Sequence, residues 1–488
     1  MFDEIPQLKL LNICYDCVGD TYLSALIEHN NNPALCVQCG EKDPAISYQE
    51  LAEVVDEAFK IHYYRTTDQM SGYEYAMHRD DEIDYSWEQD GESAESIVAE
   101  QVGIAEDCAL DITKILAYNY FDMEMAKMGE PTEYSDDAKY EPKRVDSFGL
   151  HDEWRIFRDR VEKDERYFSE ASKAYLDSIF GDIETLVTRN RGSVIAEINP
   201  GDENSVFYRG RIFHSEKNVQ TAMIRPDLEI GPTPPSKAAS GRMNAKGISV
   251  FYGATDPEIS LSELRPPVGS SVIMGEFKLV RPVRLLDLNL LSEVIAIGSI
   301  FDPEFERLEA RSHFLTSLVQ IMTRPTNPWM ADEEYLPTQL IADYIANAHP
   351  AKLDGILFPS SQSKVAGYNV VLFRRASHVK PIEIGESSDI DTKTYEQCGE
   401  DEYERHYSVT EWAPKEEEAV IAKEPIAAQV VERLMGLTDT LIDEKNYTLE
   451  INLENLKVRI IEESNYPTDD YTVRRYKYEK LKPKEMPF

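Results

Sequence analysis

Basic residues are scarce relative to acidic ones in this sequence, and long apolar runs are missing. The 488 residues include 51 Lys and Arg against 90 Asp and Glu, which gives a formal net charge of −39. A charge of this sign argues against binding to duplex nucleic acid, because that binding neutralises many phosphates. No apolar run approaches the roughly 20 residues that cross a bilayer, so we expect no membrane partner.

Cysteine is also rare, and the first residues lack the features of a secretory signal. Six cysteines in 488 residues are too few for a disulfide framework. The segment that begins at Met1 has neither the basic region nor the apolar core of a signal peptide. Because hydrophobic residues still make up 42% of the chain, a sizeable core can form. We therefore expect a folded, multidomain protein of the cytoplasm.

Changes in composition divide the chain into four segments. Residues 1–45 hold four of the six cysteines, and residues 46–190 are helical in pattern and acidic. Between 195 and 385, short β-rich runs such as SVFYRGRIF and YNVVLFRR alternate with helical patterns, which indicates a mixed α+β domain. Residues 386–488 form a charged C-terminal extension with two strand-like stretches, YTLEINL and LKVRIIE.

Helical periodicity is clearest in the first half of the chain. Ser47 and Glu50 form a capping-box signature at the start of a helix. Residues 152–180 resemble one long amphipathic helix, which Gly181 would end. Its expected apolar stripe consists of Trp154, Phe157, Val161, Phe168, Ala171, Tyr175 and Ile179. Further helices are expected at 93–105, 109–126, 257–264, 303–323, 337–348 and 424–436.

Two Cys-x2-Cys pairs predict a zinc site near the N-terminus. Cys14 and Cys17 are followed, after 18 residues, by Cys36 and Cys39. This spacing is typical of tetrathiolate zinc sites, in which each pair supplies two ligands. Because all four ligands come from the protein, we expect the metal to be structural. Two redox dithiols and four unrelated cysteines are the alternative interpretations, and Cys108 and Cys398 have no partner signature.

A basic island interrupts the acidic chain. Residues 207–250 contain seven Lys and Arg but three Asp and Glu, and Arg209 lies inside an apolar strand pattern. An arginine in such surroundings needs a partner, so the island predicts an anionic ligand. Residues 65–140 are the opposite case, with 20 Asp and Glu against five Lys and Arg. This asymmetry suggests that the acidic segment masks the basic one, within one chain or between protomers.

The order of motifs in this region resembles the RES domain, named for an arginine, a glutamate and a serine. The motifs are Tyr208-Arg209, the segment GRMNAKG at 241–247, the segment FYGA at 251–254, a helix ending near Glu263, and a late serine. RES proteins are similar to toxins of bacterial toxin–antitoxin pairs that consume NAD+, and their fold resembles ADP-ribosyltransferases. The N-terminal part resembles the HEPN/RES N-terminal domain of longer family members.

The resemblance implies roles for individual residues. Arg209, Glu263 and Ser361 would be the family arginine, glutamate and serine, with Ser360 and Ser363 as neighbouring choices for the serine. Tyr208, Arg242, Tyr252 and Ser360 would contact the substrate. NAD+ would be a substrate rather than a hydride carrier, because the Gly-x-Gly-x-x-Gly fingerprint of dinucleotide-binding folds is absent. An antitoxin or regulatory protein is the implied partner. Whether the protein forms a homo-oligomer is left open by the sequence.

The chemistry of NAD+ cleavage suits these residue types. Breaking the nicotinamide–ribose bond develops positive charge on the ribose, as in glycoside hydrolysis, and one carboxylate can stabilise that charge. Guanidinium groups suit the pyrophosphate, and a tyrosine ring can stack on the nicotinamide. Water, inorganic phosphate, or a protein or nucleotide as acceptor would give hydrolysis, phosphorolysis or ADP-ribosylation. The alternative is a non-catalytic, nucleotide-binding interaction protein.

An Arg-x4-6-His spacing typical of HEPN ribonucleases is also present, but it is unspecific. Three pairs satisfy it: Arg144 with His151, Arg209 with His214, and Arg307 with His313. Because the pattern recurs in three unrelated settings, it is weak support for a ribonuclease.

Overall fold

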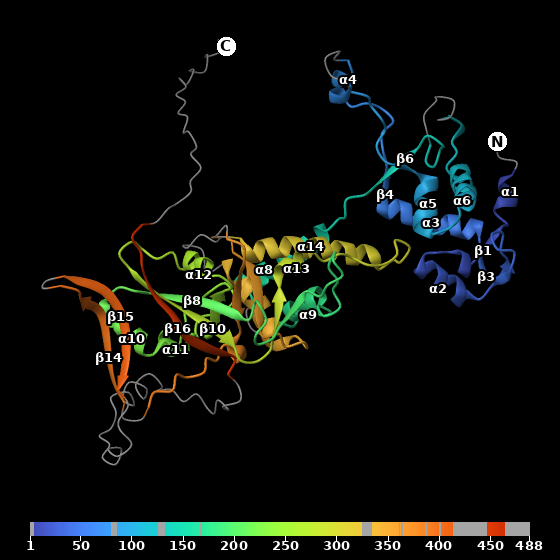
Figure 1. Ribbon diagram of the computed structural model, residues 1–488. Coiled ribbons are helices and arrows are strands. Elements are labelled where there is room, and N and C mark those ends of the chain that lie inside the picture. The colour runs from blue at the N-terminus through green and yellow to red at the C-terminus, as the bar shows by residue number, and fades with distance from the viewer. Residues whose placement is uncertain are drawn as a thin grey trace, which may run out of the picture.

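The computed structural model of the chain describes most of its length. The described residues are 4–79, 85–124, 132–165, 168–324, 334–360, 362, 365–385, 388–399, 402–412 and 447–463. The helix expected at 424–436 and the candidate residue Ser361 lie outside them. Figure 1 shows an N-terminal unit, residues 4–142, at one end of the molecule and a larger unit built on a sheet, residues 148–463, beside it.

The N-terminal unit begins with a small antiparallel sheet whose strand order is β1-β3-β2. Its elements are α1 (Ile5–Leu8), β1 (Asn12–Cys14), the 3-10 turn η1 (Tyr15–Cys17), α2 (Thr21–Asn30), β2 (Pro33–Leu35) and β3 (Lys42–Ser47). The helix α3 (Tyr48–His62) starts at the predicted capping box, in which the Ser47 hydroxyl and the Glu50 carboxylate cap each other's backbone amides. The sheet with its cysteines therefore leads directly into the helical part.

The rest of this unit combines helices with a second sheet of order β4-β6-β5. Its elements are β4 (Tyr63–Arg65), α4 (Gly72–His78), β5 (Glu92–Ser93), α5 (Ala94–Val102), α6 (Glu106–Asn119) and β6 (Lys139–Pro142). One core joins residues of both parts, including Ile13, Cys36, Leu51, Ile97 and Ile112. The segment 1–45, which we expected to form a separate module, thus shares its core with the helices that follow it.

The prediction of one long helix at 152–180 is wrong, because two helices occupy this segment. They are α8 (Phe148–Lys163) and α9 (Glu170–Phe180), and Gly181 follows the second helix as predicted. Phe168 between them has a φ of 59° and a fully exposed side chain, so the helical stripe is interrupted there. Trp154, Phe157 and Ile179 belong to a core shared with the large sheet. The hydrophobic packing therefore does not follow the boundary expected near residue 190.

Eight of the described strands form one mixed sheet of order β16-β10-β8-β9-β13-β12-β11-β7. Their bounds are β7 (Ile195–Ile198), β8 (Val206–Phe213), β9 (Phe251–Ala254), β10 (Ser271–Leu279), β11 (Val283–Asp287), β12 (Gly355–Pro359), β13 (Tyr368–Leu372) and β16 (Leu449–Ile460). The runs SVFYRGRIF and YNVVLFRR, which we expected to form strands, contain β8 and β13 of this sheet. The two stretches expected in the C-terminal extension are one continuous strand, β16, which pairs with β10 along the sheet edge.

The two faces of this sheet carry separate cores. Leu286 and Val371 point to one core, whereas their chain neighbours Leu285 and Val370 point to the other, as the alternation of side chains along a strand requires. On the first face lie α8, α9, α13 (Leu288–Ser292), α14 (Phe305–Thr323), α16 (Leu336–Asp343) and the π-helical turn η3 (Tyr344–Ala348). The second face is covered by α10 (Glu216–Ile224) and α11 (Pro226–Glu229).

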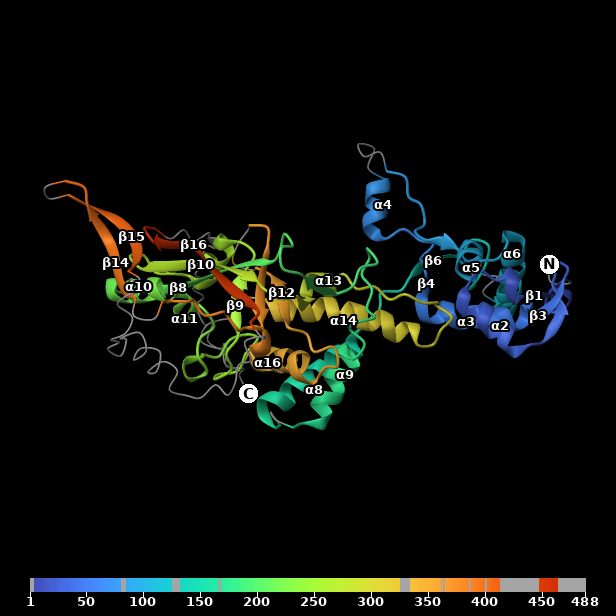
Figure 2. The same cartoon turned by 60° about the horizontal axis from the view of Figure 1, so that its bottom comes forward.

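The N-terminal unit contacts the sheet unit near the start of α14. Phe301 is buried in the N-terminal core although it precedes α14 in the chain, and Ser299 donates a hydrogen bond of 3.0 Å to Asp20. His62 lies 3.4 Å from Glu309 of α14. Both views show this contact at the end of α14 farthest from β8 and α12 (Pro257–Leu264) (Figures 1 and 2).

A two-stranded hairpin projects from the opposite end of the molecule. It consists of β14 (Asp389–Gln397) and β15 (Tyr403–Trp412), which pair with each other antiparallel, and Figure 2 shows it pointing away from the sheet unit. Short 3-10 turns at Pro235–Lys237 (η2) and Arg374–Ala376 (η4) complete the elements. No helix in the described ranges is both long and apolar enough to cross a bilayer.

Candidate functional site

A pocket with a volume of about 590 Å³ lies where β8, β9, β12 and β13 meet α12, and we call it the sheet pocket. Six residues that the sequence analysis assigned to the site or its motifs line it, namely Arg209, Gly241, Arg242, Tyr252, Gly253 and Glu263. Its other walls include Ser240, Arg265, Thr323, Tyr335, Phe358, Gln362 and Asn369. Residues that are widely separated in the sequence therefore share one cavity.

Arg209 spans the opening between β8 and β9. These two strands pair only through Tyr208 and Ala254, so they separate beside Arg209. Its Nε donates to the carbonyl of Ile230 at 2.8 Å, and an Nη donates to the carbonyl of Tyr252 at 2.6 Å. Burial, together with the nearby charge of Arg211, lowers the pKa of Arg209 to about 10, so it remains cationic at neutral pH. Within the described residues, no carboxylate pairs with this guanidinium.

The ring of Tyr252 is held in the wall of the pocket by its hydroxyl group. The hydroxyl donates to the Asn244 side chain at 2.9 Å and accepts from the Met243 amide at 3.0 Å. Burial raises the pKa of Tyr252, so the phenol stays protonated at neutral pH. A Cβ on Gly241 would lie 2.5 Å from the Asn244 oxygen and 2.8 Å from the Tyr252 hydroxyl. Glycine at this position therefore permits the turn to close against the tyrosine.

Arg242 connects the pocket to the end of α14. Its guanidinium donates to the carbonyls of Met322 at 2.9 Å and Arg324 at 2.7 Å, which are backbone acceptors left open where a helix ends. Its side chain also stacks over the ring of Tyr335 at 5.3 Å. Burial lowers the pKa of Arg242. The structure thus gives Arg242 a helix-capping role, and its guanidinium still forms part of the pocket wall.

Glu263 enters the pocket from the last turn of α12. Its Oε1 accepts a hydrogen bond from the Ser360 hydroxyl at 3.0 Å and another from the Asn369 amide at 2.8 Å. No hydrogen bond to Oε2 is seen among the described residues. One oxygen of this carboxylate is therefore fixed by the protein, and the other remains available to a ligand.

The charge in the sheet pocket is predominantly positive. Arg209, Arg242 and Arg265 supply three guanidinium groups, against the single carboxylate of Glu263 among its described lining residues. Guanidinium groups bind phosphate oxygens in bidentate geometry, and a pocket of this volume is typical of small-molecule sites. The arrangement can hold an anionic ligand while presenting one carboxylate to a reacting centre.

Three of the predicted site residues, Tyr208, Ser360 and Ser361, are not among the described residues that line the pocket. Tyr208 is absent from its described lining; it precedes Arg209 on β8, and side chains alternate between faces of a strand. Ser361 lies outside the described residues, whereas its neighbour Ser360 bonds Glu263. Asn369 and Tyr335 were missed. Asn369 was recognisable as an amide within the apolar strand sequence YNVVLF, but Tyr335 follows no motif.

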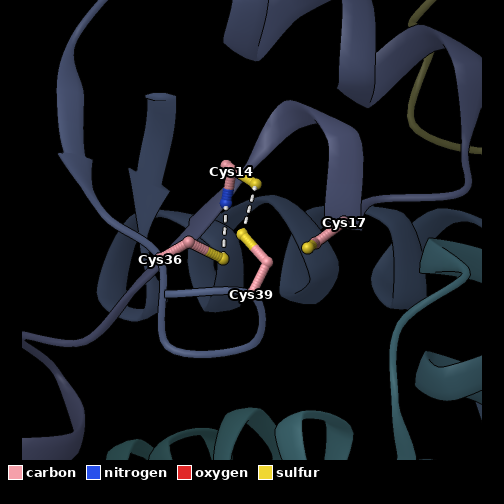
Figure 3. Close-up of side chains that lie close together, drawn as sticks. All are labelled: Cys14, Cys17, Cys36 and Cys39. Carbon is pink, nitrogen blue, oxygen red and sulfur yellow. Dashed lines mark hydrogen bonds between the residues drawn. The ribbon is translucent and has the colours of Figure 1, made fainter. Parts of the chain in front are cut away.

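The four cysteines of the N-terminal unit form a compact cluster (Figure 3). The ligand atoms of Cys14, Cys17, Cys36 and Cys39 all lie within 4.8 Å of one another. The Sγ atoms of Cys14 and Cys39 are 3.7 Å apart, and the Cys14 amide donates to the Cys36 sulfur at 3.4 Å. Sulfurs around a tetrahedral zinc ion, at Zn–S bonds of about 2.3 Å, would be about 3.8 Å apart. The donor set and the spacing therefore fit a tetrahedral metal ion.

Backbone amides around the cluster favour the charged form of one thiol. Burial alone would raise the pKa of Cys36, but amide hydrogen bonds from Cys39, Cys14 and Gln38 bring it to about 6. Burial raises the pKa of Cys17. Cys108 is buried with its sulfur 3.8 Å from the Gln38 side chain, and Cys398 is exposed. The four paired cysteines are thus the residues that could hold a metal.

The two weaker sequence hypotheses receive no support from the geometry. His151 packs edge-on against Phe314 at 5.2 Å, Arg144 is exposed, and neither is among the described residues that line the sheet pocket. None of the described residues of 65–140 lines the sheet pocket. The described residues of the acidic segment therefore do not form part of the basic site within one chain.

Comparison with known proteins identifies one part of the chain. The family model of the RES domain matches residues 211–392, a segment that begins just after Arg209 and contains Arg242, Tyr252, Glu263 and Asn369. The chain therefore contains a RES domain, which indicates a role connected with NAD+. No curated protein and no solved structure matches the chain. The resemblances to ADP-ribosyltransferases and to a HEPN-type N-terminal domain stay predictions.

Proposed function

We propose that the sheet pocket binds NAD+ as a substrate and cleaves its nicotinamide–ribose bond, and that the protein acts as a toxin or defence effector. The observation that carries the proposal is that Arg209 and Glu263 line the same pocket. Arg209 has no described carboxylate partner, which suits a pyrophosphate, and one oxygen of Glu263 accepts no hydrogen bond from the described residues.

In this proposal each residue acts on a different part of NAD+. Arg209 and Arg242 face the pyrophosphate, and the ring of Tyr252 packs against the nicotinamide. When the bond breaks, its electron pair moves to the nicotinamide nitrogen, which becomes neutral, and positive charge develops on the ribose. Glu263 stabilises this charge. No strong general acid is needed, because the leaving group departs uncharged.

The acceptor determines the product. Water would form a bond to the ribose carbon, lose its proton and give ADP-ribose. Inorganic phosphate would bond to the same carbon and give ADP-ribose that carries a phosphate there. A protein or nucleotide acceptor would make the enzyme an ADP-ribosyltransferase. Incubation with NAD+ in the presence and absence of phosphate, followed by chromatography of the products, distinguishes these outcomes. If the wild-type protein releases no free nicotinamide under any of these conditions, the remaining interpretation is a non-catalytic, nucleotide-binding protein.

We further propose that the cysteine cluster holds one structural Zn2+ ion. Four cysteine ligands leave no open coordination position on the metal, which suits a structural site rather than a catalytic one. The bound metal would cross-link the segments of the N-terminal core that carry these cysteines. The predicted cytoplasmic location and the antitoxin or regulatory partner belong to the same proposal. Expression in cells should lower NAD+, and it should not do so for Glu263→Gln.

A further inference from the structure

Asn369 is a buried polar residue of the sheet pocket that the proposed chemistry does not yet use. It lies on β13, where it is opposite Ala254 of β9 and Phe358 of β12. Only 4% of its surface is exposed. An amide in such an apolar setting loses its hydration, so it is retained at low cost only if it is hydrogen-bonded. Its Nδ2 meets this need by donating to Glu263 at 2.8 Å.

The hydrogen bond is directed at one oxygen of the carboxylate. Asn369 and Ser360 both donate to Oε1 of Glu263, from β13 and from the end of β12. Two donors on one oxygen restrict the rotation of a carboxylate that stands at the exposed end of α12. The Ser360 hydroxyl can rotate away, but the Asn369 amide belongs to a buried strand. Asn369 therefore supplies the rigid part of this arrangement.

We propose that Asn369 is a positioning residue, which fixes Oε1 of Glu263 so that Oε2 faces the ribose of the substrate. The inference rests on the proposed function, and it adds a residue on which the rate of bond cleavage depends. Because Asn369 contacts Glu263 and not the pyrophosphate site around Arg209, it should affect kcat more than KM. The other charged side chains that line the pocket in the described residues are Arg209, Arg242 and Arg265.

Two substitutions test this role. Asn369→Leu replaces the amide by an apolar side chain of similar size and so removes the donor, and we expect kcat to fall about 10- to 100-fold with KM nearly unchanged. Asn369→Asp keeps the shape but places a second carboxylate next to Glu263. Two carboxylates at this distance retain one shared proton, so the acidic limb of the pH–rate profile should move to higher pH. A purely structural asparagine would change the melting temperature without moving the profile.

Asn452 provides a matched control. Its Nδ2 donates to the Glu276 carboxylate at the same distance of 2.8 Å, between β16 and β10 and outside the described pocket lining. Asn452→Asp therefore creates the same kind of carboxylate pair away from the sheet pocket. We expect it to leave the pH–rate profile unchanged.

A second measurement is independent of turnover. In folded Asn369→Asp the carboxylate pair binds more protons than in the unfolded chain, so stability falls as pH rises. The melting temperature of Asn369→Asp should fall further below that of wild type as the pH rises from 5 to 8. Adding Glu263→Gln to this variant should remove the pH dependence of the difference.

The outcomes separate the two proposals. If the wild-type enzyme is active but the Asn369 variants keep its pH–rate profile, kcat and KM, the positioning role alone is overturned. Wild-type protein without nicotinamide release would overturn the proposed function and the positioning role with it. The melting temperatures would then still report whether the contact exists.

Discussion

Ser360 donates a hydrogen bond of 3.0 Å to the carboxylate of Glu263, although the two residues are 97 positions apart in the chain. The contact joins the residue after β12 to the last turn of α12, beside the sheet pocket that Glu263 lines. The glutamate and one of the candidate serines that the RES resemblance implied thus interact directly. In the proposed function, a substrate would meet the carboxylate next to this contact.

Glu263→Gln should lower the rate of nicotinamide release by about 100-fold or more, because the amide cannot stabilise a cationic ribose. The melting temperature should change little, since the side chain is exposed. Release is measured at saturating NAD+, with thermal unfolding as the check on folding. A variant that cleaves NAD+ as fast as wild type would show that Glu263 has no catalytic role.

Arg209→Lys should weaken NAD+ binding by about tenfold or more, because lysine cannot reproduce the forked guanidinium. Loss of the bonds to the carbonyls of Ile230 and Tyr252 should also destabilise the fold by about 1–3 kcal/mol. Arg211→Lys is the control, since Arg211 is exposed and pairs with Glu229. Calorimetric titration with NAD+ measures both variants. Equal affinities for them would contradict the assignment of Arg209.

Cys36→Ser should abolish zinc binding and destabilise the N-terminal unit by more than about 4 kcal/mol, since metal loss removes a cross-link of its core. Elemental analysis should find about one zinc per wild-type chain. Cys398→Ser, which alters an exposed cysteine outside the cluster, should retain the metal. The zinc assignment fails if purified wild-type protein contains none, or if Cys36→Ser binds as much as wild type.

Asp182→Asn should destabilise the attachment of α9 to α14 in a pH-dependent way. Arg311 of α14 is 5% exposed and donates to Asp182 at 3.0 Å, and these hydrogen bonds lower the pKa of Asp182. A lowered pKa in the folded state stabilises the fold above the ordinary carboxyl pKa, and this contribution is lost as pH falls. The difference in melting temperature between wild type and variant should therefore be largest near neutral pH and shrink below about pH 4. A constant difference would contradict it.

Local sequence signals predicted the individual elements well. The helix expected at 257–264 is α12 with the same bounds, and the capping box at Ser47 starts α3. Both depend on interactions within a few residues of chain. The helix expected at 152–180 failed because its apolar spacing continued through Phe168, whose backbone turns to positive φ. Periodicity alone does not report such a break.

The site was only partly predictable for a physical reason. The sequence order of the RES resemblance led to Arg209, Tyr252 and Glu263, which the structure brings into one pocket. The capping of α14 by Arg242 depends on where Met322 ends up after folding, and no local pattern encodes that. Asn369 meets Glu263 only because β13 lies beside β9 and under α12. Such contacts follow from topology and not from spacing.

The position of β16 has a consequence for synthesis of the protein. This strand covers β10, which in turn pairs with the Arg209 strand β8, and its Leu449 and Ile451 fill the second core. A growing chain therefore exposes the edge of β10 and an open core until the residues of β16 have left the ribosome. A transcript cut short before that point would encode a sheet with one strand missing. Early termination would thus leave the cell with an incompletely folded protein, and the activity would depend on translation beyond β16.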